Sequence, residues 1–133
     1  MRTLIVEDDF TCRRILQLLL APYGECDIAV DGLEAVDAYQ LAVNEKKPYD
    51  LVCMDIMMPN MNGQEALKKI KEIEFDMSLS TGERAKVIMV TALDDPKSIM
   101  GAFKEQCEAY LVKPIKSDKL IAMLKDLELI EAT

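Results

Sequence analysis

Three carboxylates stand directly after two short apolar segments and are the residues best suited to chemistry. Glu7 and Asp8 follow a segment that ends at Val6, and Asp55 follows a segment that ends at Met54. Carboxylates about 5 Å apart repel one another by roughly 3 kcal/mol per pair at an effective dielectric constant near 20, so a cluster of three must be neutralised. Proton uptake or a hard divalent cation would do this, and a ligand set of oxygen atoms alone favours Mg²⁺ or Mn²⁺.

Two further side chains would complete a site for a phosphoryl group. Thr91 and Lys113 each stand at the end of a later apolar segment. A divalent cation and a lysine together neutralise the charge that develops on the oxygens of a phosphoryl group during transfer. Asp55 is the best acceptor, because its carboxylate is already ionised at pH 7 and needs no general base to form an aspartyl phosphate. These residues therefore predict phosphoryl transfer to Asp55.

The composition excludes several other classes of function. The chain has 133 residues, no histidine, 24 acidic residues and 16 basic residues, for a formal charge of −8. Without imidazole, Ser-His-Asp catalysis, Cys-His catalysis and histidine-ligated zinc are excluded. The negative charge repels nucleic acid and anionic membranes, so neither is expected as a partner. Four scattered cysteines and the lack of a signal-peptide pattern predict reduced thiols and a cytoplasmic location.

The apolar segments alternate with segments of helical periodicity, which predicts repeated βα units. The expected strands are Thr3–Val6, Cys26–Val30, Tyr49–Met54, Val87–Thr91 and Ala109–Val112. Continuous apolar strands are typical of a sheet covered on both faces. We therefore predict an α/β fold with a doubly wound, five-stranded parallel sheet, helices on both faces and a single domain over residues 1–133. Ligands bind at the carboxyl ends of such strands, where the polar residues named above would meet.

Helix starts and one loop can also be predicted. Three helix-start signals are Asp31-Gly32-Leu33-Glu34, Asn62-Gly63-Gln64-Glu65 and Asp95-Pro96. The first two resemble capping boxes, and the third places proline where the first turn of a helix tolerates it. We expect Asp9 to cap the first helix rather than to bind metal. Residues Glu74 to Lys86 have the weakest periodicity and predict an exposed loop.

Four blocks of sequence together resemble the receiver domain of bacterial two-component response regulators. The blocks are Ile5-Val6-Glu7-Asp8-Asp9, Met54-Asp55-Ile56-Met57-Met58-Pro59-Asn60-Met61-Asn62-Gly63, Val90-Thr91-Ala92 and Tyr110-Leu111-Val112-Lys113-Pro114. They occur in the family's order and spacing and span nearly the whole chain. The resemblance implies a flavodoxin-like fold with strand order 2-1-3-4-5, and a stand-alone regulator similar to those of chemotaxis.

The resemblance also implies a role for each matched position of the site. Asp55 would accept a phosphoryl group from a histidine kinase or a histidine phosphotransfer protein. Asp8, Asp55 and the backbone carbonyl of Met57 would bind Mg²⁺, while Glu7 would act largely through a metal-bound water. Lys113 would pair with oxygens of the phosphoryl group. The protein would then be a switch that catalyses only its own phosphorylation and dephosphorylation, not an enzyme with a separate substrate.

Further matched positions imply how the switch would work. Thr91 would move to hydrogen-bond the phosphoryl group, and Tyr110 would turn inward as it does so. The surface formed by the fourth helix, the fifth strand and the fifth helix would change and control a downstream protein. The peptide bond before Pro114 is expected to be cis, as in other such domains.

Three alternative functions fit parts of the same pattern. A Mg²⁺-dependent phosphatase acting through an aspartyl phosphate usually has a second aspartate two residues after the nucleophile, but this chain has Met57 there. A flavodoxin-like cofactor binder would need a Ser/Thr/Gly-rich phosphate loop after the first strand, where this chain has Glu7-Asp8-Asp9. A receiver that acts without phosphorylation would not need the intact set of acidic and basic residues.

Overall fold

The computed structural model describes residues 1–93, 96–104 and 106–131. It contains one parallel sheet in the order β2-β1-β3-β4-β5, as predicted. The strands are β1 Thr3–Val6, β2 Cys26–Ala29, β3 Leu51–Met54, β4 Lys86–Thr91 and β5 Ala109–Val112. The helices are α1 Phe10–Leu20, α2 Gly32–Asn44, α3 Gly63–Asp76, α4 Pro96–Lys104 and α5 Ser117–Asp126, with short 3₁₀ turns η1 Ala21–Tyr23 and η2 Thr81–Glu83.

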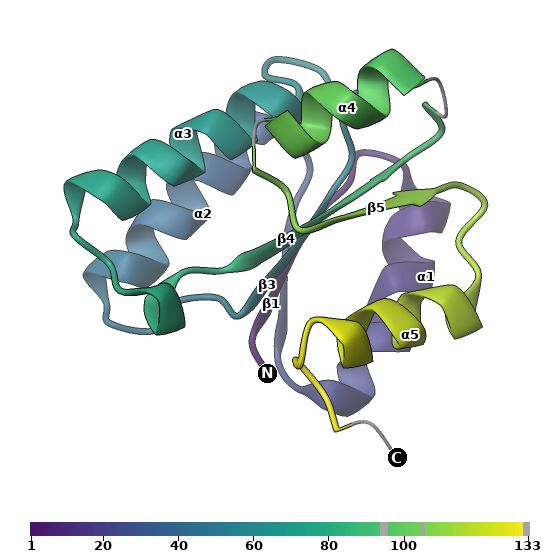
Figure 1. Cartoon of the computed structure of the whole chain (residues 1–133), viewed down its shortest axis with the longest axis horizontal. Coiled ribbons are helices and arrows are strands. Elements are labelled where there is room, and N and C mark those ends of the chain that lie inside the picture. Colours follow the sequence, from purple (N-terminus) through teal and green to yellow (C-terminus); the bar gives the residue numbers. More distant parts are fainter. Residues whose placement is uncertain (94–95, 105, 132–133) are drawn as a thin grey trace.

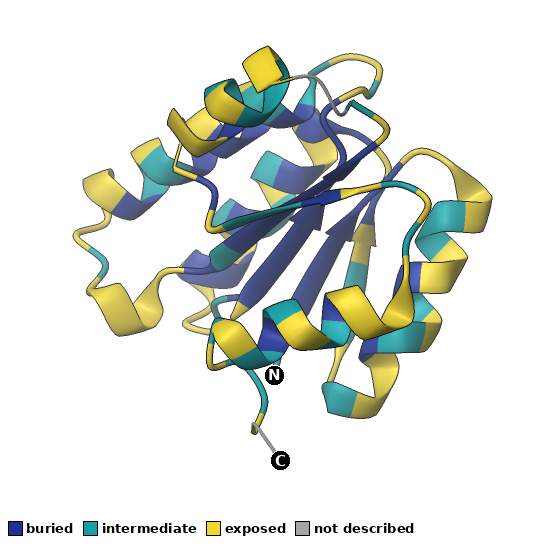
Figure 2. Ribbon diagram, turned by 45° about the vertical axis from the view of Figure 1, so that its right-hand side comes forward, coloured by how far each residue is buried: buried dark blue, intermediate teal, exposed yellow. Residues whose placement is uncertain are grey.

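The helices cover both faces of the sheet, which confirms the predicted layers. Figure 1 shows α1 and α5 on one face and α2, α3 and α4 on the other. Because successive strand residues point to opposite faces, the chain builds two cores. Leu4 and Val6 of β1 join the core beneath α2 and α3, whereas Ile5 joins the core beneath α1 and α5. The central strands are therefore buried along their length, as Figure 2 shows.

The predicted strands agree with the structure to within two residues at each end. β1 and β5 have the predicted bounds, while β2 ends one residue early, β3 begins at Leu51 and β4 begins at Lys86. The differences lie at the edges of apolar runs, where an apolar side chain such as Tyr49 can be buried without joining the ladder. Each predicted site residue consequently keeps its place at or just beyond a strand end.

The expectation of an exposed loop from Glu74 to Lys86 is wrong at both ends. Helix α3 continues to Asp76, and Glu74 on its last turn is only 1% exposed. The Glu74 carboxylate accepts hydrogen bonds from the Tyr39 hydroxyl at 2.5 Å and from the Ala85 backbone N–H at 3.1 Å. These donors compensate the burial of a charged residue that the sequence pattern assigns to the surface.

The helix starts form as the capping signals predict. Asp9 caps α1 by accepting a hydrogen bond from the Cys12 N–H at 3.0 Å. Asp31 accepts from the Glu34 N–H, and Asn62 and Glu65 form a reciprocal capping box on α3. Helix α4 begins at Pro96, whereas Asp95 of the third signal lies outside the described residues.

All four cysteines carry free thiols. No helix among the described residues is both long enough and apolar enough to cross a membrane.

Candidate functional site

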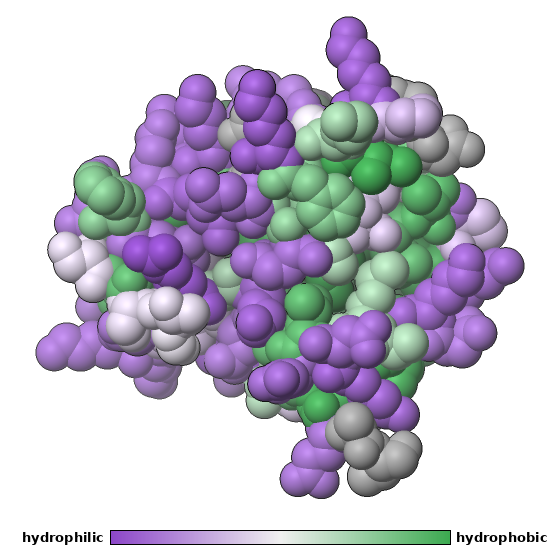
Figure 3. All heavy atoms as spheres, viewed as in Figure 1, coloured by the Kyte–Doolittle hydropathy of each residue, from purple (hydrophilic) through white to green (hydrophobic). Residues whose placement is uncertain are grey.

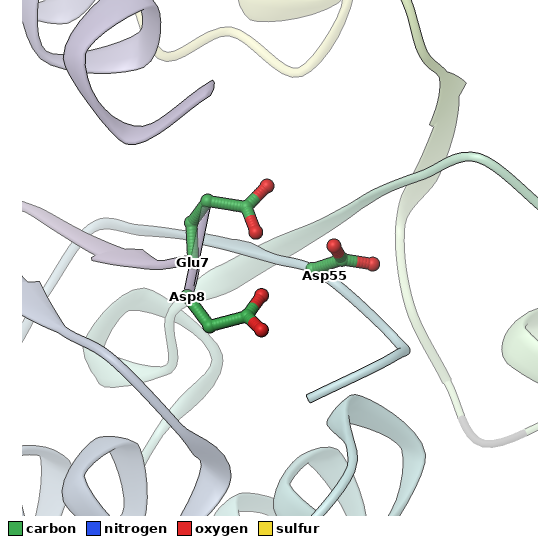
Figure 4. Close-up of side chains that lie close together, drawn as sticks. All are labelled: Glu7, Asp8 and Asp55. Carbon is green, nitrogen blue, oxygen red and sulfur yellow. The ribbon is translucent and has the colours of Figure 1, made fainter. Parts of the chain in front are cut away.

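The carboxyl ends of β1 and β3 bring the three predicted carboxylates together. β1 pairs directly with β3, with Val6 opposite Met54, so the residues that follow these strands are neighbours. Glu7, Asp8 and Asp55 each offer an oxygen within 4.8 Å of the others. Figure 4 shows the three side chains close together, with the carboxylates of Glu7 and Asp8 extending toward the side on which Asp55 lies. Glu7 and Asp55 are buried and Asp8 is exposed, which leaves the cluster open to solvent on one side.

Lys113 is the cation of this cluster, and it reaches two of the three carboxylates. It follows β5, and its backbone N–H donates to the Thr91 carbonyl at 2.8 Å. Its ammonium nitrogen lies 2.5 Å from Glu7 Oε1 and 2.8 Å from Asp55 Oδ2. One lysine against three carboxylates would leave about two excess negative charges if all four groups were ionised.

The protonation of the cluster reflects this imbalance. Burial raises the pKa of Glu7 to about 7, and the negative charge of Asp55 adds to the shift while Lys113 opposes it. Burial acts to lower the pKa of Lys113, but its hydrogen bonds to Asp55 and Glu7 outweigh burial and raise that pKa above its usual range. A proton on Glu7 is thus one way in which the protein relieves its excess negative charge, and a bound dication is another.

The arrangement fits Mg²⁺ in its donor chemistry. All three side chains offer oxygen, the ligand atom that Mg²⁺ prefers. An open cleft of about 430 Å³ adjoins Asp8 and is lined also by Met57 and Asn62. Mg²⁺ keeps several waters when proteins bind it, and a cleft of this size has room for those waters and for a phosphoryl group.

The backbone around Asp55 fixes both its carboxylate and the loop that follows it. The Asp55 N–H donates to the Val6 carbonyl at 3.0 Å, and Asp55 Oδ1 accepts from the Met57 N–H at 3.1 Å. Gly63 closes the loop, because its N–H donates to the Ile56 carbonyl at 2.8 Å. A Cβ atom at Gly63 would come within 2.1 Å of the Asp55 carbonyl oxygen, so only glycine allows this approach.

Thr91 and Tyr110 lie on the β4 and β5 side of the site and are connected through Leu93. Thr91 is fully buried at the end of β4, and its hydroxyl accepts a long hydrogen bond of 3.4 Å from the Leu93 N–H. The half-buried Tyr110 donates its hydroxyl proton to the Leu93 carbonyl at 2.6 Å. The peptide bond between Lys113 and Pro114 is cis.

Two contacts around the site are not evident from the sequence. The Arg13 side chain donates to the backbone carbonyl of Glu7 at 3.2 Å and lies over the ring of Phe10. The Asn60 side chain donates to Asp31 at 2.7 Å, across 29 residues of sequence. The capping pattern identified Asp31 only as a helix start, and nothing in the local pattern of Arg13 indicates its partner.

Comparison with known proteins places this fold and site in a class of signalling domains. The response regulator receiver domain family matches residues 3–125. The chain is 37% identical over 121 residues to the two-component response regulator ARR10 of Arabidopsis thaliana, covering 90% of this chain and 20% of that regulator. It is 34% identical over 125 residues to the chemotaxis protein CheY of Thermotoga maritima, covering 92% and 93% of the two chains.

A solved structure supports the same assignment. The crystal structure of the CheX-CheY-BeF3-Mg²⁺ complex from Borrelia burgdorferi superposes with a TM-score of 0.79 at 29% identity, covering 96% of this chain and 89% of that one. The chain belongs to the response regulator receiver domain family, and it functions in two-component signal transduction. The predictions of family, fold and signalling function are therefore confirmed, and the comparisons give no support to the phosphatase alternative.

Proposed function

We propose that Asp55 accepts a phosphoryl group from a histidine kinase or a histidine phosphotransfer protein, and that this modification controls a downstream protein. The observation that carries the proposal is the cluster of Glu7, Asp8 and Asp55 within 4.8 Å, with Lys113 touching two of them. The three carboxylates outnumber the one lysine beside them, and an open cleft adjoins the cluster. Such an excess is suited to a cation and its phosphoryl ligand.

Within this proposal each residue has a defined task. Asp8, Asp55 and the backbone carbonyl of Met57 would hold Mg²⁺ or Mn²⁺, and Glu7 would act through a water on the ion. The bound ion would supply neutralisation of charge on the phosphoryl oxygens. Lys113, which contacts Asp55 before reaction, would then pair with a phosphoryl oxygen.

The transfer step requires no proton removal from the acceptor. An Asp55 carboxylate oxygen forms the new O–P bond while the P–N bond of the donor phosphohistidine breaks, and the electron pair of that bond stays on the donor imidazole. Residues 1–133 contain no histidine, so the donor imidazole must lie outside them. The reaction is then a modification of the receiver itself, and no separate substrate is turned over. In this proposal residues 1–133 act as a single domain.

The downstream partner would bind the face formed by α4, β5 and α5. Exposed apolar side chains on this face include Met100, Phe103 and Val112. Figure 3 shows hydrophobic surface running from α4 across β5 toward α5 among hydrophilic neighbours. Thr91 and Tyr110, joined through Leu93, would connect the phosphorylated site to this face. We infer a protein partner, not nucleic acid or membrane, because the chain carries a net charge of −8, and we infer a cytoplasmic location.

A phosphorylation assay tests the proposal directly. The protein is incubated with Mg²⁺ and acetyl phosphate or phosphoramidate, and intact mass spectrometry should detect one added phosphoryl group. Asp55→Asn and chelation with EDTA should each abolish the addition. Asp37→Asn, a charge-matched change on the exposed side of α2, should be labelled like the wild type. Equal labelling of wild type and Asp55→Asn would reject Asp55 as the acceptor.

A further inference from the structure

The loop between β3 and α3, residues 56–62, is attached to the start of α2. The Asn60 side-chain amide donates to Asp31 Oδ2 at 2.7 Å. Beside it, the Gly32 N–H donates to the Met61 carbonyl at 3.1 Å. One side-chain contact and one backbone contact therefore join the loop that follows the acceptor aspartate to a helix that contributes no residue to the carboxylate cluster.

Asp31 divides its two carboxylate oxygens between α2 and the loop. Oδ1 accepts from the Glu34 N–H at 2.9 Å and caps α2, while Oδ2 accepts from Asn60. The residue is only 8% exposed. The hydrogen bond from Glu34, with that from Asn60, lowers the pKa of Asp31, so the ionised form accepts both. Helix capping alone would use one oxygen, and the second is committed to the loop.

The backbone on both sides of the contact is fitted to a close approach. A Cβ atom at Gly32 would lie 2.3 Å from the Met61 carbonyl oxygen, so any larger residue would push the loop away. Asn60 has a φ of 66°, in the left-handed region that asparagine tolerates better than most residues. Asn60 thus provides both the backbone conformation of the loop tip and the amide that binds Asp31.

The loop is held at its base as well as at its tip. At the base, Gly63 donates to the Ile56 carbonyl at 2.8 Å, and the Met57 N–H donates to Asp55 Oδ1 at 3.1 Å. Met57 therefore lies between two anchored points of a short loop. A carbonyl held between such points loses little conformational freedom when it binds a ligand, which favours affinity.

We propose that Asp31 is a positioning residue of the phosphorylation site, which through Asn60 holds the β3–α3 loop and so places the Met57 carbonyl before a cation binds. The inference rests on the proposed function, because that carbonyl matters to phosphorylation only as a ligand of Mg²⁺. Supporting residues behind the ligands of a metal site typically change metal affinity by 10-fold to 100-fold when they are mutated. We expect an effect at the lower end of this range, because the base of the loop remains closed.

Two variants separate positioning from helix capping. Asp31→Ser keeps an oxygen to cap α2 but cannot reach Asn60, and Asn60→Gly keeps the left-handed backbone but removes the amide. Each should weaken Mg²⁺ binding about tenfold, and the double variant should be no weaker than either single one. Glu34→Ala is the matched control, since it removes the Glu34 side chain from the Val30 N–H at the start of α2 and leaves the loop contact in place.

Two measurements decide the outcome. Isothermal titration calorimetry gives the Mg²⁺ affinity, and amide hydrogen exchange of the metal-free protein reports how firmly residues 56–62 are held. Asp31→Ser and Asn60→Gly should exchange faster than wild type in this loop, need about tenfold more Mg²⁺ for half-maximal phosphorylation, and reach the wild-type rate at saturating Mg²⁺.

The results that would overturn the inference differ from those that would overturn the proposed function. If wild type binds Mg²⁺ and is labelled on Asp55, but both variants bind Mg²⁺ as tightly or keep wild-type exchange in the loop, the positioning role is wrong and the function stands. An equal loss of affinity in Glu34→Ala would also overturn it, because the effect would then come from α2 alone. Wild-type protein that fails to bind Mg²⁺ would reject both.

Discussion

Two clusters of carboxylate and lysine lie near opposite ends of the sheet, and they treat negative charge differently. Near the amino ends of the strands, Glu74 is as buried as Glu7 of the proposed phosphorylation site. Its Oε2 accepts from Tyr39 and from the Ala85 N–H, and its Oε1 lies 3.3 Å from the Lys71 ammonium. This buried carboxylate has three fixed partners. Glu108, the second acid near Lys71 at 3.8 Å, accepts from the Val87 N–H, so each acid of this balanced cluster has donors of its own.

At the carboxyl ends of the strands, carboxylates outnumber the positively charged groups, and we call this the unbalanced cluster. Glu7, Asp8 and Asp55 share one ammonium group, that of Lys113, which contacts two of them. Burial of a carboxylate therefore does not by itself mark a functional site, since Glu74 is buried for structural reasons. The candidate site differs in gathering three carboxylates within 4.8 Å of one another beside one ammonium group, and folding alone gives no reason to gather them.

Removing Glu74 should give the largest effect on stability. Glu74→Ala leaves the Tyr39 hydroxyl and the Ala85 N–H without their acceptor and breaks the ion pair with Lys71, so we expect a loss of about 4 kcal/mol in the free energy of unfolding. Urea denaturation measures this loss. Phosphorylation of the folded variant should be unchanged.

The neighbouring residue Glu72 provides the control for Glu74. Its side chain is about half exposed and is 3.9 Å from Lys69, so Glu72→Ala should cost only about 0.3 kcal/mol. Similar losses in Glu74→Ala and Glu72→Ala would show that the buried carboxylate is not part of the structural framework.

The excess of carboxylates around Glu7 should make the metal-free protein less stable as the pH rises. The pKa of Glu7 is raised from 4.5 to about 7, so the folded metal-free protein binds more protons than the unfolded chain between these values. Its contribution to stability is fully present below pH 4.5 and is lost as the pH rises through 7. We expect a decline of about 2 kcal/mol across this interval, less than the full shift would give because solvent on the open side of the cluster screens the charges.

The comparison that isolates Glu7 uses Glu7→Gln in the presence of EDTA. The free energy of unfolding of this variant, measured by heat or urea, should fall less between pH 4.5 and 7 than that of wild type. Glu72→Gln, with the same charge change on an exposed side chain, should follow the wild type. A wild-type stability that rises relative to Glu7→Gln as the pH increases would contradict the assigned direction of the shift.

Removing one donor from the balanced cluster should have a smaller cost. Tyr39→Phe deletes the hydroxyl that donates to Glu74, and we expect a loss of about 1.5 kcal/mol in the free energy of unfolding. Tyr49→Phe is a matched control, because the Tyr49 hydroxyl donates at 2.6 Å to Asp27, whose side chain is 39% exposed and can be rehydrated. Equal losses in the two variants, measured in urea, would mean that burial of the acceptor is not decisive.

The sequence predicts the unbalanced cluster better than the balanced one. Apolar runs end abruptly before Glu7 and Asp55. A parallel sheet brings the carboxyl ends of its strands to one edge, so the contact between these two residues follows from the sequence pattern and the topology. Glu74 has no comparable signal. Its partner Tyr39 is 35 residues away, and an acid among lysines on a helix has the pattern of a solvated face.

The same limit applies within the site. The capping pattern identifies the oxygen of Asp31 that binds Glu34, three residues on, but not the oxygen that binds Asn60. The switching roles proposed for Thr91 and Tyr110 rest on family resemblance, because a strand-end threonine or tyrosine alone is typical of ordinary packing. Local signals thus predict short-range contacts and strand ends, whereas pairs of polar side chains distant in sequence depend on the folded packing.

The smallest expected effect is a gain in stability, whereas the substitutions in the balanced cluster cause losses. Asp8→Asn removes one of the three clustered negative charges from an exposed position, so it should raise the free energy of unfolding of the metal-free protein by about 1 kcal/mol. Mg²⁺ should stabilise wild type more than this variant, because binding to the folded state alone shifts the unfolding equilibrium. Urea unfolding with and without Mg²⁺ measures both effects, with Asp37→Asn as the control. Destabilisation of the metal-free protein by Asp8→Asn would mean that the cluster carries no charge excess, and the difference between the two ends of the sheet would lose its physical basis.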